Sequence, residues 1–283
     1  MTCLVTGANA GMGYWIATGL AQQGAQVVMV CRNAEKGRAA RDQIARATGN
    51  SQIDVLVADL ASQQSIRQMA QLFRERYAQL HVLVNNAGAH IQQRQLTAEG
   101  IEMNLMVNHL SSFLLTNLLL DSLGASASAR VINVASNSMT PTIDLADLQS
   151  ERSFEPWQAY GQAKLAMVLT TYALARRLAG TGITVNALHP GLVGTDIVAD
   201  VAPPIARPFL GLIKRFLFTP EQGALAALYL AISPEVAGVT GAYFNRRKKS
   251  RSVVGSYDQV LQEQVWGKSL DLVGLERDIV MLL

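Results

Sequence analysis

The sequence predicts an α/β fold, a doubly wound parallel sheet of about seven strands with helices on both faces. Three observations support this prediction. Short apolar runs alternate with helical segments, a glycine-rich turn follows the first run, and polar residues stand directly after several later runs. Short apolar strands separated by helices are typical of a parallel sheet covered on both faces. No linker or low-complexity segment interrupts the alternation, so we expect one domain over residues 1–283.

The alternation can be followed from the first residues. An apolar run at 2–6 leads into the glycine turn, and a helical pattern then continues to about Gln23. Further strands are expected at 26–31, 53–59, 81–88, 130–136 and 183–189, and further helices at 34–47, 62–78, 101–123, 157–178 and 220–232. The amphipathic segments at 101–123 and 157–180 could pair with a second copy of the chain in a homo-oligomer. A C-terminal helical extension is expected at 252–283.

The glycine turn has the spacing Gly7-x-x-x-Gly11-x-Gly13. Gly7 would permit a tight exit from the first strand, and Gly11 would let backbone amides approach phosphates at the helix N-terminus. Gly13 would let the helix pack closely on the strand. This order of strand, glycine turn and helix indicates a Rossmann-type site for a dinucleotide pyrophosphate.

The end of the second strand indicates which dinucleotide is preferred. A site that binds a ribose 2′-hydroxyl would place Asp or Glu there, whereas this strand ends in Cys31-Arg32. A guanidinium forks onto phosphate oxygens, and Lys36 stands one helical turn later. The sequence therefore favours NADP over NAD, with an ordinary solvated strand end as the alternative for Arg32.

Polar residues also follow the later strands. Asp59, Asn86 to Gly88, Ser136 and the 189–191 turn all fall at predicted carboxyl ends of strands. Ligands of open α/β sheets bind at that edge. We therefore expect these residues to converge on one site, although Ser136 alone would equally suit a turn or a helix cap.

Tyr160 and Lys164 lie four residues apart in the predicted helix at 157–178, and therefore on one face of it. An ammonium beside a phenol favours the phenolate and is expected to lower the pKa of Tyr160. Such a tyrosine can donate and accept a proton near neutral pH. An isolated Tyr-x-x-x-Lys pair is usually an inconsequential surface pair, but here it accompanies a dinucleotide turn and a serine at a strand end.

The composition limits the partners. Hydrophobic residues make up 49% of the chain and charged residues 16%, and a formal net charge of +3 is too small to indicate nucleic acid. The dense basic run at 246–251 is expected to be a solvated loop, with contact to phosphate or anionic lipid as the alternative. Cys3 and Cys31 lie in apolar runs, and Cys3 leaves no room for a preceding signal peptide, so we expect a soluble cytoplasmic protein without disulfides.

Residues 192–219 form a connection of a length that is often a lid. Apolar residues along it, such as Phe209 and Phe216, suggest a cover for a lipophilic substrate. Lys214 and Arg215 would equally suit a peripheral membrane contact or a partner surface. An ordinary mobile lid with an apolar underside remains the alternative to both.

Taken together, these motifs strongly resemble those of the short-chain dehydrogenase/reductase superfamily over essentially the whole chain. TGANAGMG is similar to the cofactor turn of that family, NNAG to its adenine-side motif, YGQAK to its YxxxK and HPG to the turn beneath the nicotinamide. CRNAEKG, VNHLSSFLLTNLLL and TPEQGA resemble the retinol-dehydrogenase-like branch.

The resemblance implies a role for each matching residue. Tyr160 would be the general acid and base, and Lys164 would hold the cofactor ribose. Ser136 would bind the substrate oxygen, with Ser138 as the alternative, and Asn108 would hold a water that links Lys164 to solvent. The cofactor site would comprise Gly7, Asn9, Gly11, Met12, Gly13, Arg32, Lys36, Asp59, Leu60, Asn86, Ala87, Gly88, Tyr160, Lys164, Pro190, Gly191, Val193 and Thr195.

The resemblance thus implies an NADP-dependent oxidoreductase that transfers a hydride between the nicotinamide and a lipophilic carbonyl/alcohol pair. No metal is expected, because the four histidines show no ligand spacing and both cysteines are expected in the core. An NAD-dependent enzyme is a second hypothesis. A third, from a different class, is a non-catalytic NADP-binding sensor or scaffold, which would be expected to lack the tyrosine, lysine or serine.

Overall fold

A computed structural model describes residues 1–194 and 217–276. Most of the predicted lid at 192–219, including Thr195, lies outside these residues, as does the end of the predicted C-terminal extension. The elements are β1 (Thr2–Thr6), α1 (Gly11–Gln22), β2 (Gln26–Cys31), α2 (Ala34–Thr48), β3 (Ile53–Val57), α3 (Gln63–Arg76), β4 (Val82–Asn85), α4 (Met103–Leu105), a π-helical turn (Met106–Leu110), α5 (Ser111–Leu118), α6 (Leu120–Gly124), β5 (Ala129–Val134), α7 (Pro156–Arg177), β6 (Ile183–His189), α10 (Pro220–Ile232), β7 (Tyr243–Asn245), β8 (Lys248–Ser250) and α11 (Gln259–Val273).

The strands form one sheet in the order β3-β2-β1-β4-β5-β6-β7-β8. All neighbouring strands are parallel except β7 and β8, which are antiparallel. The expected doubly wound parallel sheet is confirmed, but it has eight strands instead of about seven. The eighth, β8, lies in the basic run that was expected to be a loop. It escaped the sequence analysis because its three residues are all exposed and have no apolar face.

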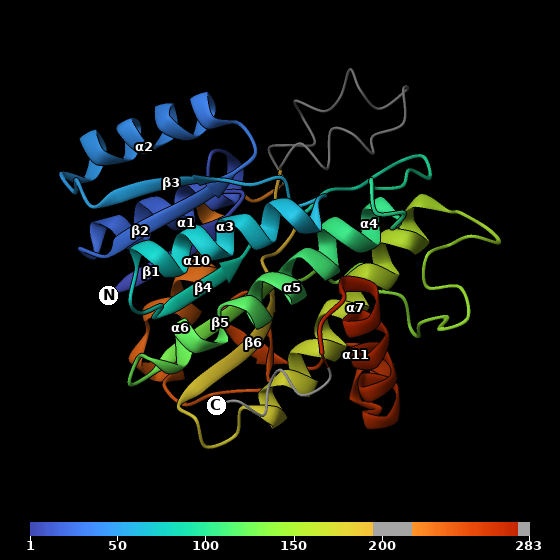
Figure 1. Cartoon of the computed structure of the whole chain (residues 1–283). Coiled ribbons are helices and arrows are strands. Elements are labelled where there is room, and N and C mark those ends of the chain that lie inside the picture. Colours follow the sequence, from blue (N-terminus) through green and yellow to red (C-terminus); the bar gives the residue numbers. More distant parts are fainter. Residues whose placement is uncertain (195–216, 277–283) are drawn as a thin grey trace.

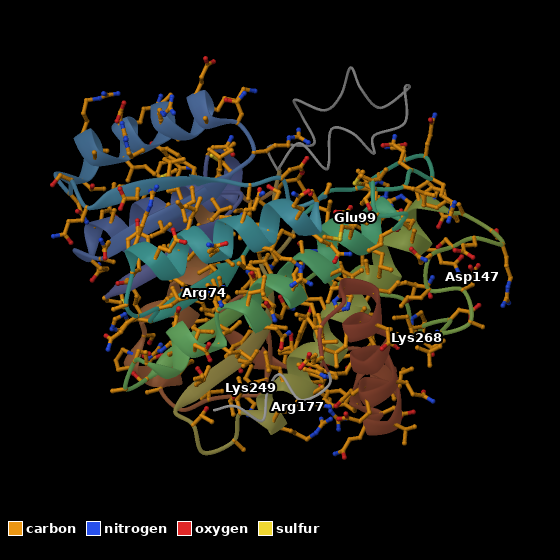
Figure 2. All side chains as sticks on the ribbon, viewed as in Figure 1. Arg74, Glu99, Asp147, Arg177, Lys249 and Lys268 are labelled. Atoms are coloured by element: carbon orange, nitrogen blue, oxygen red, sulfur yellow. The ribbon has the colours of Figure 1, made fainter. Side chains whose placement is uncertain are left out.

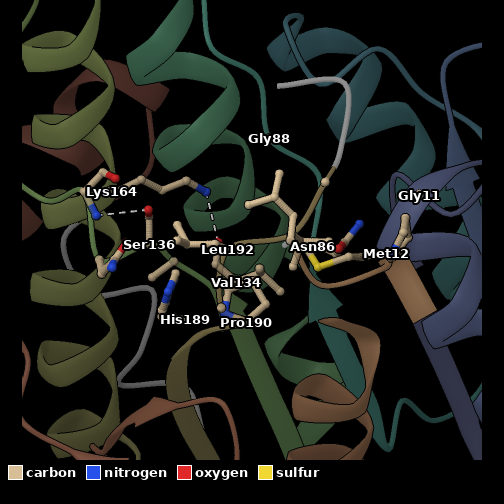
Figure 3. Close-up of a pocket in the computed structure, with 18 of the residues that line it drawn as sticks. Gly11, Met12, Asn86, Gly88, Val134, Ser136, Lys164, His189, Pro190 and Leu192 are labelled. Atoms are coloured by element: carbon tan, nitrogen blue, oxygen red, sulfur yellow. Dashed lines mark hydrogen bonds between the residues drawn. The ribbon is translucent and has the colours of Figure 1, made fainter. Parts of the chain in front are cut away.

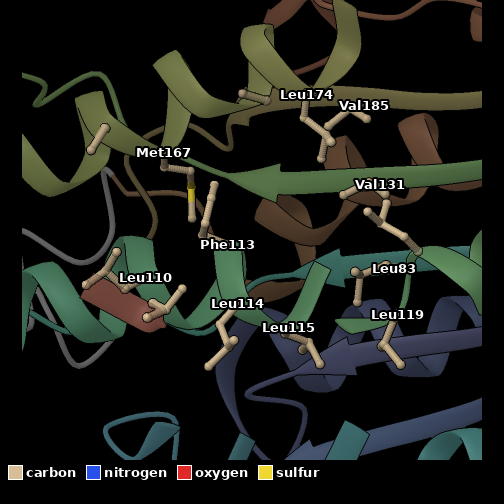
Figure 4. Packing of buried hydrophobic residues seen from close by; sticks show 14 of the residues in the cluster. Leu83, Leu110, Phe113, Leu114, Leu115, Leu119, Val131, Met167, Leu174 and Val185 are labelled. Carbon is tan, nitrogen blue, oxygen red and sulfur yellow. The ribbon is translucent and has the colours of Figure 1, made fainter. Parts of the chain in front are cut away.

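Two hydrophobic layers cover the two faces of this sheet. One contains buried residues of α3, α5, α7 and α11, and the other contains residues of α1, α2 and α10. Figure 1 shows α3, α5 and α7 side by side across one face. Figure 4 shows the packing within that layer, where Phe113 of α5 lies near Met167 of α7. The strands β1, β2, β4, β5 and β6 are buried on both sides, which explains their nearly continuous apolar runs.

The helical segment expected at 101–123 is interrupted. α4 is followed by the π-helical turn Met106–Leu110, then by α5 and α6. A π-helical turn inserts one extra residue into a helix and is frequent at functional sites. The apolar pattern of the segment conceals the interruption, because residues on all sides of α5 are buried.

α7 begins at a strong local signal. The Glu155 carboxylate accepts hydrogen bonds from the backbone amides of Trp157 and Gln158, and Pro156 occupies the first helical position. The helix then runs through the centre of the molecule with Ala159–Ala175 entirely buried. Such a helix is hydrophobic all round because other elements cover it on every side.

The C-terminal helix α11 supplies part of that cover. It packs along α7, where Arg176 forms an ion pair with Glu263 at 2.9 Å and the Arg177 guanidinium lies 4.3 Å from the Trp266 ring centre. Arg177 is labelled in Figure 2 beside α11. Part of the α7 surface is therefore covered by the chain's own helix. No described helix is long and apolar enough to cross a bilayer.

Candidate active site

A cavity of about 600 Å³ opens at the carboxyl ends of the strands, between the glycine turn and α7. Its walls come from the β1–α1 turn, the ends of β4, β5 and β6, and the first turns of α7. Figure 3 shows Gly11 and Met12 at one end, Ser136 and Lys164 at the other, and Asn86 between them. This is the edge at which the polar residues were expected to converge, where the strand order reverses between β1 and β4.

The glycine turn has the backbone that its sequence predicts. Gly7 and Gly11 have positive φ angles of 66° and 56°, in the region that other residues rarely adopt. A Cβ on Gly13 would stand 2.1 Å from the Gly7 carbonyl oxygen. Only glycine therefore lets α1 start this close to β1. A Cβ on Gly11 would meet no atom of the described residues within 4 Å, so the backbone there is open to a ligand.

Asn86 braces the same turn from β4. Its side-chain amide donates to the Thr6 carbonyl oxygen at 2.9 Å, and its backbone amide donates to the Thr6 hydroxyl at 2.9 Å. Ala87 donates to that hydroxyl as well, at 3.0 Å. The Asn86 side chain thus ties the end of β4 to the end of β1, and it also lines the cavity.

Lys164 projects from α7 toward the end of β5. Its ammonium donates to the Val134 carbonyl oxygen at 2.9 Å, and the residue is only 3% exposed. Burial lowers the pKa of Lys164 to about 8. The amine lies 5.8 Å from the centre of the Tyr160 ring, so the two side chains share one wall of the cavity as expected from their spacing.

The expected lowering of the Tyr160 pKa is wrong for this structure. Burial raises that pKa, and a hydrogen bond with the Ser136 hydroxyl offsets only part of the increase. The reason is that Tyr160 is only 7% exposed, and burial penalises the phenolate. The neighbouring ammonium is directed at the Val134 carbonyl instead of the phenol oxygen, so it does not reverse this effect.

Ser136 lies directly after β5 and is held from two sides. Its hydroxyl accepts a hydrogen bond from the Ser138 backbone amide at 3.1 Å. Its carbonyl oxygen accepts one from the Tyr243 hydroxyl at 3.1 Å. Ser138 also lines the cavity but is exposed. The interaction with Tyr160 therefore favours Ser136 over Ser138 as the partner of the phenol.

Asn108 occupies the centre of the π-helical turn and is fully buried. Its amide nitrogen donates to the Ala89 carbonyl at 2.7 Å, and its amide oxygen accepts from the Ala89 backbone amide at 3.1 Å. A Cβ on Gly88 would come within 2.9 Å of this oxygen and 3.4 Å of the Lys164 nitrogen. Asn108 thus lies beside Lys164 and fixes the chain that follows β4, behind the cavity wall.

Arg32 and Lys36 lie outside the main cavity, near the exposed ends of β2 and α2. The adjacent β3 ends near Asp59, whose carboxylate accepts from the Ala61 backbone amide at 3.0 Å. Within the described residues Arg32 forms no ion pair. Its guanidinium is therefore not occupied by a carboxylate of those residues.

The structure gathers about half of the predicted site around the cavity. The predicted site residues that line it are Gly11, Met12, Asn86, Gly88, Ser136, Tyr160, Lys164, Pro190, Gly191 and Val193. Gly7, Asn9, Gly13, Arg32, Lys36, Asp59, Leu60, Ala87 and Asn108 lie beside or behind it and are not part of its lining. Thr195 is outside the described residues.

Two residues that the sequence analysis did not assign to the site, Trp157 and Tyr243, also shape it, together with His189 of the expected 189–191 turn. Trp157 lines the cavity with 45% of its surface exposed, and its ring packs 4.3 Å from that of His90. His189 lines it from the end of β6, and burial lowers the pKa of His189 to about 4, with Arg246 contributing less. Tyr243 supports Ser136 from β7. The spacing of Trp157, three residues before Tyr160, placed it on the same helix face.

Fold, glycine turn and cavity define a dinucleotide-binding oxidoreductase of the short-chain dehydrogenase family, and the chain belongs to that family. Residues 1–205 match the family described as short chain dehydrogenase. Within it, the chain belongs to the retinol-dehydrogenase-like branch and is an oxidoreductase acting on CH–OH groups.

Particular relatives support this placement. The chain is 41% identical to human retinol dehydrogenase 13 over 281 residues, covering 97% of this chain and 85% of that protein. It is 40% identical to human polyprenol dehydrogenase over 282 residues, covering 96% and 84%. The crystal structure of a single-residue variant of the actinorhodin polyketide ketoreductase with NADPH is 27% identical, with a TM-score of 0.68 over 90% of this chain and 97% of that one.

Proposed function

We propose that this oxidoreductase uses NADP(H) and acts on a lipophilic alcohol, aldehyde or ketone. The observation that carries the proposal is the shared cavity: Tyr160, Lys164 and Ser136 all line it, and it extends to the glycine turn. A sensor or scaffold on the same fold would not need a proton donor and a hydrogen-bonding serine beside each other.

The cavity fits the cofactor in two ways. The open backbone at Gly11 and the helix N-terminus behind it suit a pyrophosphate. Gly88 leaves open the space in front of the Lys164 ammonium, because a Cβ at this position would come within 3.4 Å of the Lys164 nitrogen. Arg32 and Lys36 would contact the 2′-phosphate, and the ketoreductase similar to this chain is described with NADPH. When bound, the cofactor supplies or accepts the hydride.

The protein would move the proton. In the reduction direction the Tyr160 hydroxyl donates its proton to the substrate oxygen, and the Ser136 hydroxyl donates a hydrogen bond to the same atom. A raised pKa keeps Tyr160 protonated at neutral pH, as an acid requires. The Lys164 ammonium then stabilises the phenolate that remains, at a distance where a buried charge is weakly screened.

The lipophilic preference is supported by the apolar residues that line the cavity. Trp157, Leu192, Val193 and Leu217 present apolar surface to the cavity, and Leu192 is 63% exposed. Retinol and polyprenol, after which two of the relatives are named, are both long apolar alcohols. Burial of such chains is favourable at roughly 25 cal/mol per Å² of apolar surface.

The proposed chemistry is tested by Tyr160→Phe. We expect NADPH consumption at 340 nm, with aldehydes and ketones of increasing chain length, to fall by about 10²–10⁴-fold. NADPH binding, measured by fluorescence titration, should stay close to that of the wild type. Turnover of the variant at the wild-type rate would remove Tyr160 from the mechanism. An inactive wild type that still binds NADPH would favour the sensor or scaffold.

The cofactor preference is tested by Arg32→Glu. Because the carboxylate would repel the 2′-phosphate and accept a ribose hydroxyl, the ratio of NADPH to NADH affinity should fall by about tenfold or more. Arg38→Glu, on the exposed surface of α2, is the matched control and should leave that ratio unchanged. Equal affinity of the wild type for NADH and NADPH would defeat the argument from Arg32.

A further inference from the structure

A second cavity, of about 350 Å³, shares the Pro190 wall with the candidate active site. It lies beside the hairpin that joins β7 to β8, at the edge of the sheet. Pockets of this size are large enough for small ligands. Nothing in the proposed hydride transfer uses it.

Three cationic side chains line this cavity: Arg246, Arg247 and Lys248. Each is exposed, and none forms an ion pair with a carboxylate in the part of the chain that the structure describes. Among the described residues, no Asp or Glu lines the cavity. Three positive charges thus line one cavity, and no negatively charged side chain among the described lining residues neutralises them.

The hairpin holds Arg246 in a specific position. Its backbone has a φ angle of 57°, a left-handed conformation that costs a residue with a side chain roughly 1 kcal/mol or more. Its amide donates to the His189 carbonyl oxygen at 2.7 Å, and its guanidinium lies 5.4 Å from the centre of the Phe218 ring. Arg246 is the first residue of the two-residue turn between β7 and β8, and such turns require a positive φ, so the hairpin itself sets this position.

The remaining walls are largely apolar. Phe218, Ala226 and Leu225 line the cavity, and Leu225 is 49% exposed. Phe218 packs behind Gly191, where a Cβ would come within 2.8 Å of the ring. A ligand in this cavity would therefore touch the reverse side of the turn that lines the active-site cavity.

We propose that this cavity binds a water-soluble phosphate monoester that carries a short apolar group. A phosphate dianion suits two guanidinium groups and an ammonium, because arginine matches phosphate oxygens with paired hydrogen bonds. The apolar group would cover Leu225 and Phe218. The site is independent of the proposed substrate and of the phosphate contact proposed at Arg32.

The hairpin offers a matched pair of double variants. Lys248 lines the cavity and Lys249, the next residue of β8, does not, since successive side chains of a strand point to opposite faces. Lys249 is labelled in Figure 2. The double variant Arg247→Gln/Lys248→Gln removes two charges from the cavity. The control double variant Lys249→Gln/Arg251→Gln removes the same charge from exposed positions in and just after the hairpin and leaves the cavity lining unchanged.

The test is isothermal titration of hexyl phosphate into the full chain at physiological ionic strength with saturating NADPH, so that the cofactor's phosphate contacts are filled. We expect saturable binding to the wild type and weaker binding of inorganic phosphate and hexanol. The Arg247→Gln/Lys248→Gln variant should weaken binding by about tenfold or more, equal to about 1.4 kcal/mol, while the Lys249→Gln/Arg251→Gln variant matches the wild type.

Several results would overturn the assignment. Absence of saturable binding would end it, as would equal losses in the two double variants, which would mean general attraction to a basic surface. Equal affinity for inorganic and hexyl phosphate would remove the apolar part of the site. Binding to phosphatidic acid vesicles but not to hexyl phosphate would mean that the basic residues contact a membrane surface and that the cavity is not a small-molecule site. NADPH binding is measured first, so failure of the proposed cofactor site is distinguished from failure of this cavity.

Discussion

At the scale of single residues, two opposing effects act on the pKa of Tyr160. Burial among Trp157, His90 and the strand ends raises its pKa, whereas the Ser136 hydroxyl stabilises the phenolate. The Lys164 amine is close, but it is committed to the Val134 carbonyl. Tyr160 is therefore protonated near neutral pH and can serve as a proton donor.

The choice between Ser136 and Ser138 gives a prediction at this scale. Ser136→Ala removes the hydroxyl that interacts with Tyr160, and we expect kcat to fall by roughly 10²-fold because a donor to the developing oxyanion is lost. Ser138→Ala should remain close to the wild type, since Ser138 contributes its backbone amide to Ser136 and keeps it in the variant. Steady-state kinetics with a saturating aldehyde distinguish the two, and the reverse order of losses would transfer the role to Ser138.

At the scale of secondary-structure elements, α11 connects the C-terminal part of the chain to the candidate active site. The His109 Nε2 atom of the π-helical turn pairs with the Ser269 hydroxyl of α11 at 2.8 Å, and both residues are fully buried. The Ser269 hydroxyl donates to the Val265 carbonyl at 2.7 Å, which assigns the proton of the pair to His109. Asn108, next to His109, fixes Ala89 behind the cavity.

Ser269→Ala tests this connection. The substitution leaves the buried His109 N–H without its acceptor, which is expected to cost about 1–3 kcal/mol of unfolding free energy. Ser250→Ala, on the exposed strand β8, is the matched control and should change stability by less than about 0.5 kcal/mol. Urea unfolding followed by circular dichroism measures both. Equal stabilities of the two variants would mean that the α11 contact adds nothing.

At the scale of the whole molecule, buried histidines couple stability to pH. Burial, with a smaller contribution from Lys164, lowers the pKa of His109 to about 3. Burial, with a smaller contribution from Arg246, lowers the pKa of His189 to about 4. Burial also lowers the pKa of His81. Between the ordinary value near 6.5 and these folded values, the unfolded chain binds protons that the folded chain does not. Stability is therefore lost as the pH falls through this interval.

We expect the unfolding free energy to fall by about 1–2 kcal/mol for each of His109 and His189 between pH 7 and pH 5. Carboxyl groups contribute little, since this range lies above their ordinary pKa values. Urea titrations at the two pH values measure the change. An unfolding free energy that is the same at pH 5 and pH 7 would show that these histidines are charged in the folded protein.

Much of the fold could be predicted from the sequence because its signals are local. The apolar runs placed β1, β2 and β6 to the residue, and the glycine spacing placed the turn before α1. The short strands β7 and β8 and the π-helical turn escaped prediction for the opposite reason. A three-residue polar strand becomes recognisable only through its pairing with β7, and an inserted helical residue has no signature in an entirely buried segment.

The sequence by itself determined the class of fold, the dinucleotide turn and the proximity of Tyr160 and Lys164, because each depends on residues within one or two turns of chain. Only the tertiary structure decided how those groups ionise, which serine meets the phenol and what covers α7. These outcomes depend on burial and on contacts between residues far apart, such as Lys164 with Val134 and His109 with Ser269. No local pattern encodes the desolvation that raises the pKa of Tyr160.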